Sequence, residues 1–529
     1  MKVLGLHKDP WHNTGASVIT EENGKVSFSN LAEERVDRKK DSRRFPLLST
    51  MACMKELGVE NFSDFDAVVM DYIIDKNDYR NDSNKIAASQ YNFLNDIDPA
   101  KIHIVNHHLA HAYSVFYSSK FERSAILIVD GRGSDRETQS LFIADKENGI
   151  RLIESTDAIG IGLLYAAVTI KIGFTILQEG KTMGLAPYGQ HVNKKFLNFP
   201  KNNYKGVCTD YSSICVENSY DMTIEHTPIE TFEDKARVAF EVQEECENAM
   251  LHLAQYAKEK TGLDNLCISG GVALNSVANY KVLQSGIFKD VFINPAASDT
   301  GISLGAALYG YHTILNQPKN YTEISPYLGP TYDDFTIRKA INKFKGFKLI
   351  DTCAFEKAAE LIADNKILGF FHGRSEMGPR ALGNRSIIMS PLKAENKDIL
   401  NSRVKFREEF RPFAPSILRE YAEEYYVIDR ESPYMLFVPL VQEDKKDVIK
   451  AVTHVDGTGR LQTVTKEFNG KYYDLIESFY KATGVPVLLN TSFNVAGEPI
   501  VESPEDALKC FLKTDIDALL IEDYLLVKE

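Results

Sequence analysis

The sequence predicts an α/β protein of two domains, and three observations lead to this class. The chain has 529 residues, which is more than one hydrophobic core ordinarily covers. Hydrophobic residues make up 44% and charged residues 26%, as is typical of a globular protein. Short apolar runs alternate with longer stretches in which apolar residues recur at helical spacing, and this alternation favours an α/β fold.

The N-terminal part contains two similar pairs of apolar runs that are joined by polar, glycine-containing segments. Residues 3–6 and 16–19 form the first pair, and residues 125–129 and 140–144 form the second. Two strand pairs of the same kind, far apart in the chain, indicate a duplicated α/β unit. Actin- and hexokinase-type folds are built from two such halves, although hairpins also occur in many other folds.

The middle of the chain predicts a long helix, a strand and a second helix, in that order. They cover residues 232–262, 266–269 and 272–283. Residues 315–347 contain three prolines among polar residues, which favours a linker, and a further α/β segment follows it. We therefore place the two domains at residues 1–340 and 345–529.

Composition excludes several classes of function. The net charge of −13 disfavours nucleic acid as a partner, because such binding depends on neutralising phosphates. No run of eighteen apolar residues occurs, so no membrane span is expected. The N-terminal apolar run turns polar at His7, which indicates a strand rather than a secretory signal. The seven cysteines form no Cys-x-x-Cys pair, so we expect reduced thiols and a cytoplasmic protein.

A histidine cluster at residues 106–112, Asn-His-His-Leu-Ala-His-Ala, is the clearest candidate site. On a helix, spacing of four residues places His107 and His111 on one face, where they can share a metal ion. Neutral imidazoles suit iron, zinc or nickel. From spacing alone, an inert pair of packed or solvated histidines is the alternative.

Two aspartates at the ends of predicted strands could complete such a site. Asp130 follows a strongly apolar run, and Asp299 lies a few residues beyond the run at 291–294. Carboxylates at the carboxyl ends of strands project into clefts in α/β folds. Taken alone, each aspartate is better explained by capping of a turn or a helix.

Three glycine-containing segments could approach a nucleotide. Residues 269–275 and 299–307 each join a strand to a helix, where free backbone amides bind phosphate. Residues 179–189 form a third segment around one cation, Lys181. None matches a P-loop or a dinucleotide fingerprint, and close packing of helix on strand is the alternative for each.

The C-terminal part is dense in arginine and lysine next to apolar strands. The cations concentrate around residues 374–385, 403–411 and 460. Guanidinium groups bind phosphate and acyl phosphate oxygens in a bidentate manner, so this pattern favours an anion pocket. Ordinary surface ion pairs are the alternative, since the acidic chain offers many partners.

Seven motifs, taken together and in this order, resemble the NodU/CmcH-type O-carbamoyltransferases over nearly the whole chain. Three lie in the first predicted domain and four in the second: His-His-Leu-Ala-His-Ala (107–112), Met-Gly-Leu-Ala-Pro-Tyr-Gly (183–189), Ser-Gly-Gly-Val-Ala-Leu-Asn (269–275), Gly-Pro-Arg-Ala-Leu-Gly-Asn-Arg-Ser (378–386), Phe-Arg-Pro-Phe-Ala-Pro-Ser (410–416), His-Val-Asp-Gly-Thr (454–458) and Asn-Thr-Ser-Phe-Asn (490–494).

The resemblance implies two modules and a reaction in two steps. The first module is expected to be actin-like, similar to the tRNA threonylcarbamoyladenosine enzyme, and the second to have a YrdC-like α/β fold. The second would form carbamoyl adenylate from carbamoyl phosphate and ATP with Mg(II). The first would then transfer the carbamoyl group to a hydroxyl of a sugar, glycan or other natural product. A homodimer is also expected from the family.

The resemblance also assigns roles to individual residues. His12 matches the proposed general base toward the acceptor hydroxyl. The metal ligands, with Fe(II) as the expected ion, would be His107, His111, Asp130 and Asp299. The adenylate would contact Lys181, Gly270, Gly271, Asn275 and Gly301. Carbamoyl phosphate and ATP would contact Lys405, Arg460, Asn490 and Ser492, with Arg380, Arg385 and Arg411 as neighbours.

Two positions depart from the family pattern, and other functions were weighed against it. Asn13 stands where relatives usually carry Asp, and Ser134 stands where Glu is frequent, so we expect both to affect the choice of acceptor. A tRNA-modifying enzyme is disfavoured by the negative charge. An actin-fold ATPase or sugar kinase has no role for the histidine cluster, and an inactive binding module need not retain these charged residues.

Overall fold

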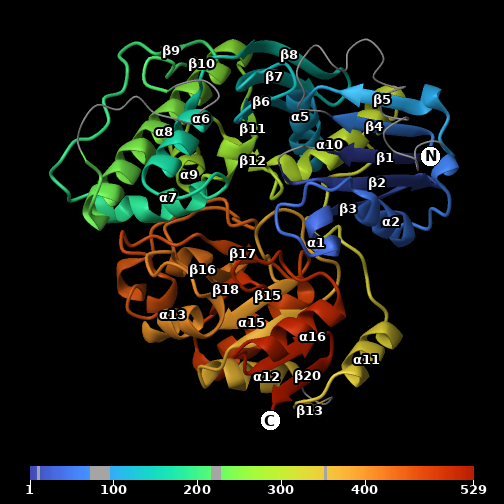
Figure 1. Cartoon of the computed structure of the whole chain (residues 1–529), viewed down its shortest axis with the longest axis vertical. Coiled ribbons are helices and arrows are strands. Elements are labelled where there is room, and N and C mark those ends of the chain that lie inside the picture. Colours follow the sequence, from blue (N-terminus) through green and yellow to red (C-terminus); the bar gives the residue numbers. More distant parts are fainter. Residues whose placement is uncertain (9–11, 72–95, 216–227, 351–353) are drawn as a thin grey trace. The chain divides into compact units, whose positions relative to one another are not determined.

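The computed structural model of the chain describes residues 1–8, 12–71, 96–215, 228–350 and 354–529. It contains two compact units, shown in Figure 1 by colours that follow the sequence. The first comprises Met1–Glu33 and Asp41–Ser325, and the second comprises Glu34–Lys40 and Pro326–Glu529. These limits differ from the domains placed at 1–340 and 345–529, which remain a prediction.

A mixed five-stranded sheet begins the first unit. Its strands are β1 (Lys2–His7), β2 (Gly15–Glu22), β3 (Lys25–Ala32), β4 (Ala67–Asp71) and β5 (Ile102–Val105). Their order in the sheet is β3-β2-β1-β4-β5. The first three pair antiparallel, whereas β4 pairs parallel with both β1 and β5. The carboxyl ends of β1, β4 and β5 therefore meet at one edge of this sheet.

The second sheet of this unit repeats the same plan. Its strands are β6 (Arg123–Val129), β7 (Gln139–Asp145), β8 (Gly149–Thr156), β11 (Asn265–Ser269) and β12 (Asp290–Ile293). Their order is β12-β11-β6-β7-β8, with β6, β7 and β8 antiparallel and β11 parallel to β6 and β12. Read in reverse, as β8-β7-β6-β11-β12, this order matches that of the first sheet strand by strand. The predicted duplication is confirmed, and with it the actin-like α/β fold.

Helices pack around both sheets of the first unit (Figure 1). They include α2 (Leu47–Glu56), α5 (His107–Ser118), α6 (Ile161–Lys171), α7 (Glu179–Leu185), α8 (Phe232–Thr261), α9 (Ser276–Gln284) and α10 (Ile302–Tyr309). Helix α10 packs on β1, β2 and α5, and α8 packs on β6, α6 and α9. Thr231 and Asp234 cap α8 reciprocally, and Gly262 ends it with φ of 65°. The helix predicted at 232–262 is confirmed.

The second unit is built on an eight-stranded mixed sheet of order β13-β20-β19-β14-β15-β18-β16-β17. The strands are β13 (Phe347–Ile350), β14 (Leu368–Phe371), β15 (Arg385–Met389), β16 (Ala414–Leu418), β17 (Gln462–Val464), β18 (Val487–Ser492), β19 (Ala518–Ile521) and β20 (Tyr524–Lys528). The main helices are α11 (Asp334–Lys343), α12 (Ala354–Ala363), α13 (Glu395–Leu400), α15 (Gly470–Thr483) and α16 (Pro504–Lys513). One apolar core joins them, as expected for the α/β C-terminal domain.

The interval 315–347, predicted to be a linker, contains α11, so the prediction was wrong there. The side chain of Asp333 accepts a hydrogen bond from the Thr336 amide and caps this helix. Ile337, Ala340 and Ile341 are buried on one face of it. This helical spacing is present in the sequence, but the prolines drew the interpretation toward a linker.

Candidate functional site

Helix α5 carries the two histidines that the sequence analysis singled out. Asn106 precedes the helix, and its side-chain oxygen accepts a hydrogen bond from the Leu109 amide 3.0 Å away. This cap fixes the start of α5, so that His107 and His111 stand one turn apart on the same face. Their ring centroids are 4.7 Å apart, and both side chains are fully buried.

Asp130, directly after β6, and Asp299, after β12, complete a four-residue cluster in the first unit. Asp130 Oδ2 lies 3.3 Å from His107 Nε2 and 3.1 Å from His111 Nε2. Asp299 Oδ1 lies 3.6 Å from each of the same two nitrogens. Each aspartate is only 7% exposed. The four predicted ligands are thus brought together from a helix and two strand ends.

The spacing of these four side chains fits a single metal ion. Tetrahedral ligands about 2.1 Å from an ion stand ~3.4 Å from one another. The histidine–carboxylate distances of 3.1–3.6 Å are close to that value. Two imidazoles and two carboxylates suit Fe(II), Zn(II) and other divalent ions, so the donor set alone does not select iron.

Hydrogen bonds on the far side of each ring present the Nε2 lone pair to this centre. His107 Nδ1 lies 2.7 Å from Asp71 Oδ2, and His111 Nδ1 lies 3.1 Å from Ser269 Oγ. The Ser269 hydroxyl donates to the carbonyl of Ala297, so it accepts from His111. Both histidines therefore carry hydrogen on Nδ1 and have Nε2 available as a ligand.

The pKa values of the cluster show that its charges compensate one another. Burial would lower the pKa of His107, but hydrogen bonds with Asp130 and Asp299 outweigh it and raise that pKa well above its ordinary value. Burial would likewise raise the pKa of Asp299, yet the two histidines hold it well below its usual range. A bound divalent ion would replace the proton shared in these contacts, so metal binding would release protons.

Two of the remaining residues predicted for the transfer site, His12 and Gly271, contact this cluster. His12 Nδ1 is 3.6 Å from Asp299 Oδ2, and the side chain is 21% exposed. The Gly271 amide donates to Asp130 Oδ1 at 2.9 Å. Asn275, four residues after Gly271, caps α9. Lys181 lies on α7 with its ammonium 5.4 Å from the centre of the Phe174 ring.

Two of the predicted glycines are required by the backbone. Gly270 has φ of 97°, and a Cβ there would lie 2.3 Å from the Val129 carbonyl oxygen. A Cβ at Gly301 would lie 2.2 Å from the Ala296 carbonyl oxygen. Close packing therefore explains both glycines, and a role in nucleotide binding stays a prediction.

The two positions that depart from the family pattern have defined structural roles. Ser134 Oγ accepts a hydrogen bond from the His107 amide at 3.0 Å, so this hydroxyl supports the first turn of α5. Asn13 has φ of 58°, a left-handed conformation that asparagine tolerates better than most residues. Their predicted effect on acceptor choice stays a prediction.

In the second unit, Lys405 and Ser492 form one part of the predicted anion site. The buried Lys405 ammonium donates to the carbonyl oxygens of Ser492 and Asn494 at 2.8 and 2.9 Å. Asn490, two residues earlier on β18, donates to Ser416 Oγ and Gln462 Oε1. The structure thus brings Lys405 and Ser492 into direct contact, and Asn490 lies nearby on the same strand.

Four arginines gather near Lys405 and repel one another. Burial and the neighbouring Arg411 lower the pKa of Arg380 to about 10 and that of Arg407 to about 9. Burial together with Arg380, Arg407 and Arg411 holds the pKa of Arg460 well below its ordinary value. The buried Nε atoms of Arg380 and Arg460 have no hydrogen-bond partner among the described residues. We call Arg380, Lys405, Arg407, Arg411 and Arg460 the cation cluster.

Arg385, which was predicted as a neighbour of this site, is held by the protein itself. It is fully buried, and its guanidinium donates to the carbonyl oxygens of His372, Gly373 and Asn384. It also stacks 3.7 Å from the centre of the Phe371 ring. These contacts favour a structural role for this arginine over ligand binding.

Sequence reasoning left Asp71, Ser269 and Arg407 out of the candidate set. Asp71 and Ser269 are polar residues that end buried apolar strands, and this pattern could have singled them out. Arg407 stands two residues after Lys405 within the same basic stretch. Its omission reflects the absence of a motif match rather than a lack of signal.

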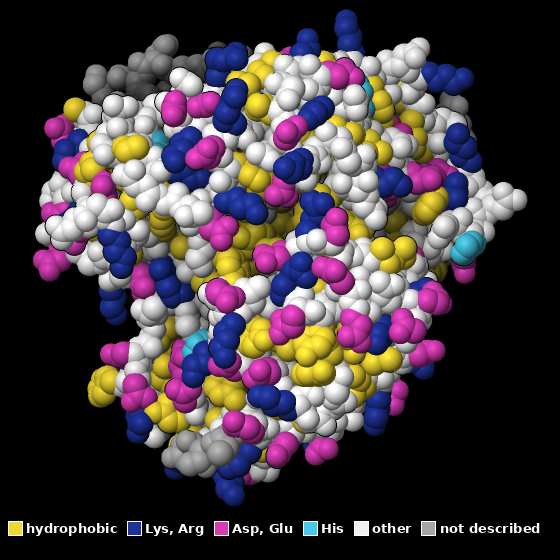
Figure 2. Space-filling view, turned by 180° about the vertical axis from the view of Figure 1, so that it is seen from behind, with side chains coloured by type: hydrophobic (Ala, Val, Ile, Leu, Met, Phe, Trp, Pro, Cys, Tyr) yellow, Lys and Arg dark blue, Asp and Glu magenta, His cyan; other side chains and the backbone are white. Residues whose placement is uncertain are grey.

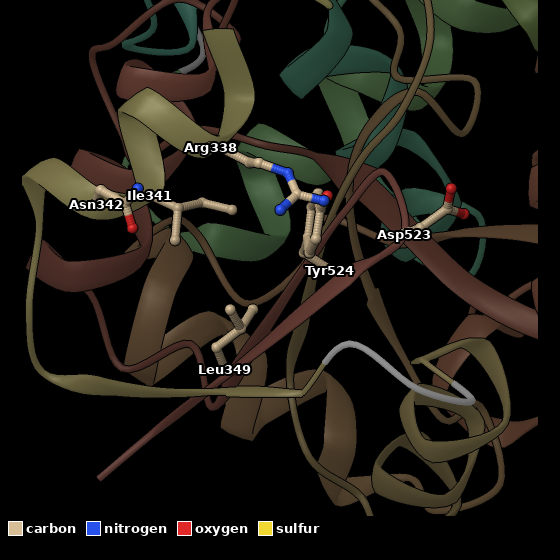
Figure 3. A pocket seen from close by; sticks show the side chains of 6 residues that line it. All are labelled: Arg338, Ile341, Asn342, Leu349, Asp523 and Tyr524. Carbon is tan, nitrogen blue, oxygen red and sulfur yellow. The ribbon is translucent and has the colours of Figure 1, made fainter. Parts of the chain in front are cut away.

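A surface pocket of the second unit lies apart from every predicted residue. Arg338, Ile341, Asn342, Leu349, Asp523 and Tyr524 line it (Figure 3). Arg338 is already paired with Asp334 at 2.8 Å, and its guanidinium lies 5.2 Å from the centre of the Tyr524 ring. This pocket offers no unpaired charge to a ligand, so it does not compete with the two charged clusters.

Comparison with known proteins decides the family. Residues 69–308 match the family model for the carbamoyltransferase N-terminus, and residues 359–528 match that for the carbamoyltransferase C-terminus. The nodulation protein NolNO of Sinorhizobium fredii is 36% identical over 97% of the chain and 79% of its own length. The chain belongs to the NodU/CmcH-type carbamoyltransferase family. This carbamoyltransferase is therefore an enzyme, as the sequence predicted.

A second sequence relative and one solved structure are also similar to this chain. The nodulation protein NolO of Bradyrhizobium diazoefficiens is 38% identical to this carbamoyltransferase over 80% of the chain and 79% of its own length. A crystal structure of full-length HypF in a phosphate- and nucleotide-bound form covers 60% of the chain and 56% of its own. It is 15% identical to this carbamoyltransferase, with a TM-score of 0.34.

Two further features are the distribution of charge on the surface and the length and polarity of the helices. Figure 2 shows acidic and basic side chains intermingled over the viewed face. The net charge of −13 is thus not concentrated there into one acidic field. Within the described ranges, every helix is too short or too polar to cross a membrane.

Proposed function

We propose that this carbamoyltransferase uses ATP and carbamoyl phosphate to carbamoylate a hydroxyl group of a sugar, glycan or other small acceptor. One observation carries the proposal: the chain has two charged sites of opposite kind. The first unit contains a cluster of two histidines and two carboxylates, which suits a cation. The second contains the cation cluster, which suits phosphate groups.

The cation cluster would carry out the first step. Water converts carbamoyl phosphate into carbamate and phosphate. A carbamate oxygen then attacks the α-phosphorus of ATP, pyrophosphate leaves with Mg(II), and carbamoyl adenylate forms. Arg380 and Arg460 would bind the phosphate oxygens through the guanidinium atoms that lack partners in the protein. Lys405, held by Ser492, would supply a further hydrogen-bond donor beside them.

The histidine–aspartate cluster would carry out the second step. A divalent ion held by His107, His111, Asp130 and Asp299 would act as a Lewis acid toward the carbamoyl carbonyl. The acceptor oxygen attacks that carbon, the bond to the phosphate oxygen breaks, and AMP leaves. His12, 3.6 Å from Asp299, would take the proton of the attacking hydroxyl. The carboxylate beside it stabilises the imidazolium that results.

Release of pyrophosphate tests this proposal most directly. Full-length protein given ATP, Mg(II) and carbamoyl phosphate, without an acceptor, is expected to form carbamoyl adenylate and pyrophosphate. Omission of carbamoyl phosphate serves as the control and should abolish pyrophosphate release. Pyrophosphate formation at the same rate without carbamoyl phosphate would contradict the proposed first step and favour a plain nucleotide hydrolase.

A further inference from the structure

The carboxylate of Asp71 lies between two buried imidazoles next to the candidate metal centre. Asp71 ends β4 and His7 ends β1, and the two residues are paired in the register of these parallel strands. Asp71 Oδ1 lies 2.6 Å from His7 Nδ1, and Asp71 Oδ2 lies 2.7 Å from His107 Nδ1. All three side chains are at most 1% exposed. Each oxygen of the Asp71 carboxylate is thus hydrogen-bonded to one imidazole.

These three side chains are suitable metal ligands, but their distances exclude an ion between them. An ion bound at about 2.1 Å would hold its ligand atoms roughly 3 Å or more apart. The contacts of 2.6 and 2.7 Å are instead those of charge-assisted hydrogen bonds. His7, Asp71 and His107 are therefore a hydrogen-bonded triad, in which only His107 also reaches the metal centre.

The positions of the hydrogens follow from this arrangement. An ionised carboxylate only accepts hydrogen bonds, so both imidazoles donate their Nδ1–H to Asp71. For His107, this leaves the Nε2 lone pair directed at Asp130 and Asp299. For His7, it leaves Nε2 buried and without a hydrogen-bond partner among the described residues. Asp71 thus determines the tautomer of a metal ligand.

The duplicated fold supplies an internal comparison for this role. Strand β4 in the first sheet corresponds to β11 in the second, because each is the fourth strand of its half. Asp71 ends β4 and accepts from His107, while Ser269 ends β11 and accepts from His111. Each half therefore supplies one Nδ1 acceptor from the equivalent strand end. The two differ in charge, since only Asp71 is a carboxylate.

We propose that Asp71, held in place by His7, is a positioning residue that fixes the tautomer and ring orientation of His107 and thereby sets the affinity of the metal centre. This inference rests on the metal centre of the proposed function. It concerns side chains that do not touch the ion. Hydrogen-bond partners of metal-bound histidines typically contribute about 10- to 100-fold to metal affinity.

Replacement by asparagine exposes this role, because an amide offers one acceptor where a carboxylate offers two. In Asp71→Asn, the NH₂ group must face one of the two imidazoles, and that ring must move its hydrogen from Nδ1 to Nε2. At His107 the change removes the ligand lone pair, and at His7 it buries an N–H group without a partner. The metal-free protein avoids that buried N–H by turning the NH₂ group toward His107, so metal binding must overcome its cost and is weakened.

The experiment measures Co²⁺ binding to the metal-stripped, full-length protein. Competition with a chromophoric chelator gives the affinity, and the visible absorption of bound Co²⁺ reports its ligand geometry. Asp71→Asn is expected to bind Co²⁺ about 10- to 100-fold more weakly than the natural protein. The matched control is Glu241→Gln, which alters a buried carboxylate of the same unit that accepts from the Phe196 and Leu197 amides. This control should retain full affinity and an unchanged spectrum.

A second variant separates positioning from a general loss of packing. In the double variant His7→Phe with Asp71→Asn, the single amide oxygen is free to face His107. The double variant is therefore expected to bind Co²⁺ more tightly than Asp71→Asn alone. A purely structural role for Asp71 predicts the opposite, because two disruptions of one buried triad should weaken binding further.

The outcomes distinguish the inference from the proposed function. If the natural protein binds no Co²⁺, the metal centre itself is refuted. If it binds Co²⁺ and Asp71→Asn matches Glu241→Gln within about twofold, the positioning role is refuted. Should Asp71→Asn fail to fold by circular dichroism, the double variant His7→Phe with Asp71→Ala decides instead, because it removes the acceptor of His107 without leaving His7 unpaired. Natural affinity and spectrum in that folded variant would overturn the inference.

Discussion

The two charged clusters of this carbamoyltransferase differ in how they manage buried charge. In the first unit, opposite charges meet: each of two histidines lies within 3.6 Å of both carboxylates. In the second unit, like charges meet, and burial together with repulsion by Arg411 lowers the pKa of Arg407 to about 9. The first cluster pairs opposite charges among its own members, whereas the cation cluster has an excess of positive charge that Glu408, 3.7 Å from Arg411, offsets only in part.

This difference separates the effects that ligands and substitutions should have. Loss of one member of the histidine–aspartate cluster leaves a buried charge without a partner, which is costly. Loss of one member of the cation cluster removes repulsion. The free energy of unfolding should therefore rise, while the rate of adenylate formation should fall. The following tests challenge this contrast, beginning with the largest expected effect.

His111→Ala should abolish carbamoyl transfer while leaving adenylate formation intact. The variant removes one proposed ligand from the first unit and touches no member of the cation cluster. We expect AMP release from supplied carbamoyl adenylate, in the presence of an acceptor, to fall by at least about a thousandfold. His103→Ala, a histidine of β5 outside the cluster, is the control. A folded His111→Ala protein that loses both steps equally would contradict the assignment of two sites.

Arg460→Ala should show the reverse pattern. Removal of a guanidinium that lacks a protein partner is expected to slow carbamoyl phosphate-dependent pyrophosphate release by roughly 10- to 100-fold. Transfer from supplied carbamoyl adenylate should stay near the natural rate. Arg403→Ala is matched to it, since Arg403 is already paired with Asp517 at 3.0 Å. Equal losses in both arginine variants would argue against a specific anion pocket.

Pyrophosphate alone should stabilise the folded protein, because it relieves repulsion within the cation cluster. At a hundred times its dissociation constant, a ligand adds about 2.7 kcal/mol to the free energy of unfolding. We expect a rise in Tm of a few degrees in thermal unfolding, and a much smaller rise in Arg460→Ala. An unchanged Tm in the natural protein would break the contrast between the two clusters.

Arg407→Met should raise the stability of the ligand-free protein at neutral pH by about 1 kcal/mol. Methionine retains much of the apolar stem that packs on Phe413 and removes the charge that Arg411 repels. The sign follows from the lowered pKa of Arg407: the unfolded state holds this proton more tightly, so the natural protein gains stability as pH rises past about 9. Chemical denaturation in phosphate-free buffer measures the difference, and a clear loss of stability would count against repulsion.

The sequence predicted features that depend on local spacing better than those that depend on strand pairing. The four-residue spacing of His107 and His111 was sufficient because a capped helix converts it directly into one face. The aspartates required the family resemblance, because nothing local shows that the ends of β6 and β12 converge on α5. The repeated hairpins correctly indicated the duplicated fold, since each is formed by neighbouring segments.

The triad around Asp71 could not be found in this way. His7 and Asp71 are 64 positions apart, and only the parallel register of β1 and β4 brings them together. Arg385 illustrates the same limit: it was predicted from its motif as a neighbour of the anion site, and the sequence does not show that it is fully buried at the start of β15, where its guanidinium donates to backbone carbonyls. Burial of a particular side chain depends on the complete sheet, which spacing alone does not describe.

The short segment Glu34–Lys40 determines how this protein can be divided experimentally. Although it follows β3 in the chain, it belongs to the second unit, where the buried Arg35 donates to the Gly378 carbonyl at 3.1 Å. Arg38 donates to the carbonyl oxygens of Pro499 and Ile500. A fragment that starts at Pro326 would lack these seven residues and leave those backbone acceptors exposed. A circularly permuted or split protein would therefore need this peptide supplied with the C-terminal part, and its addition as a synthetic peptide should improve the solubility of such a fragment.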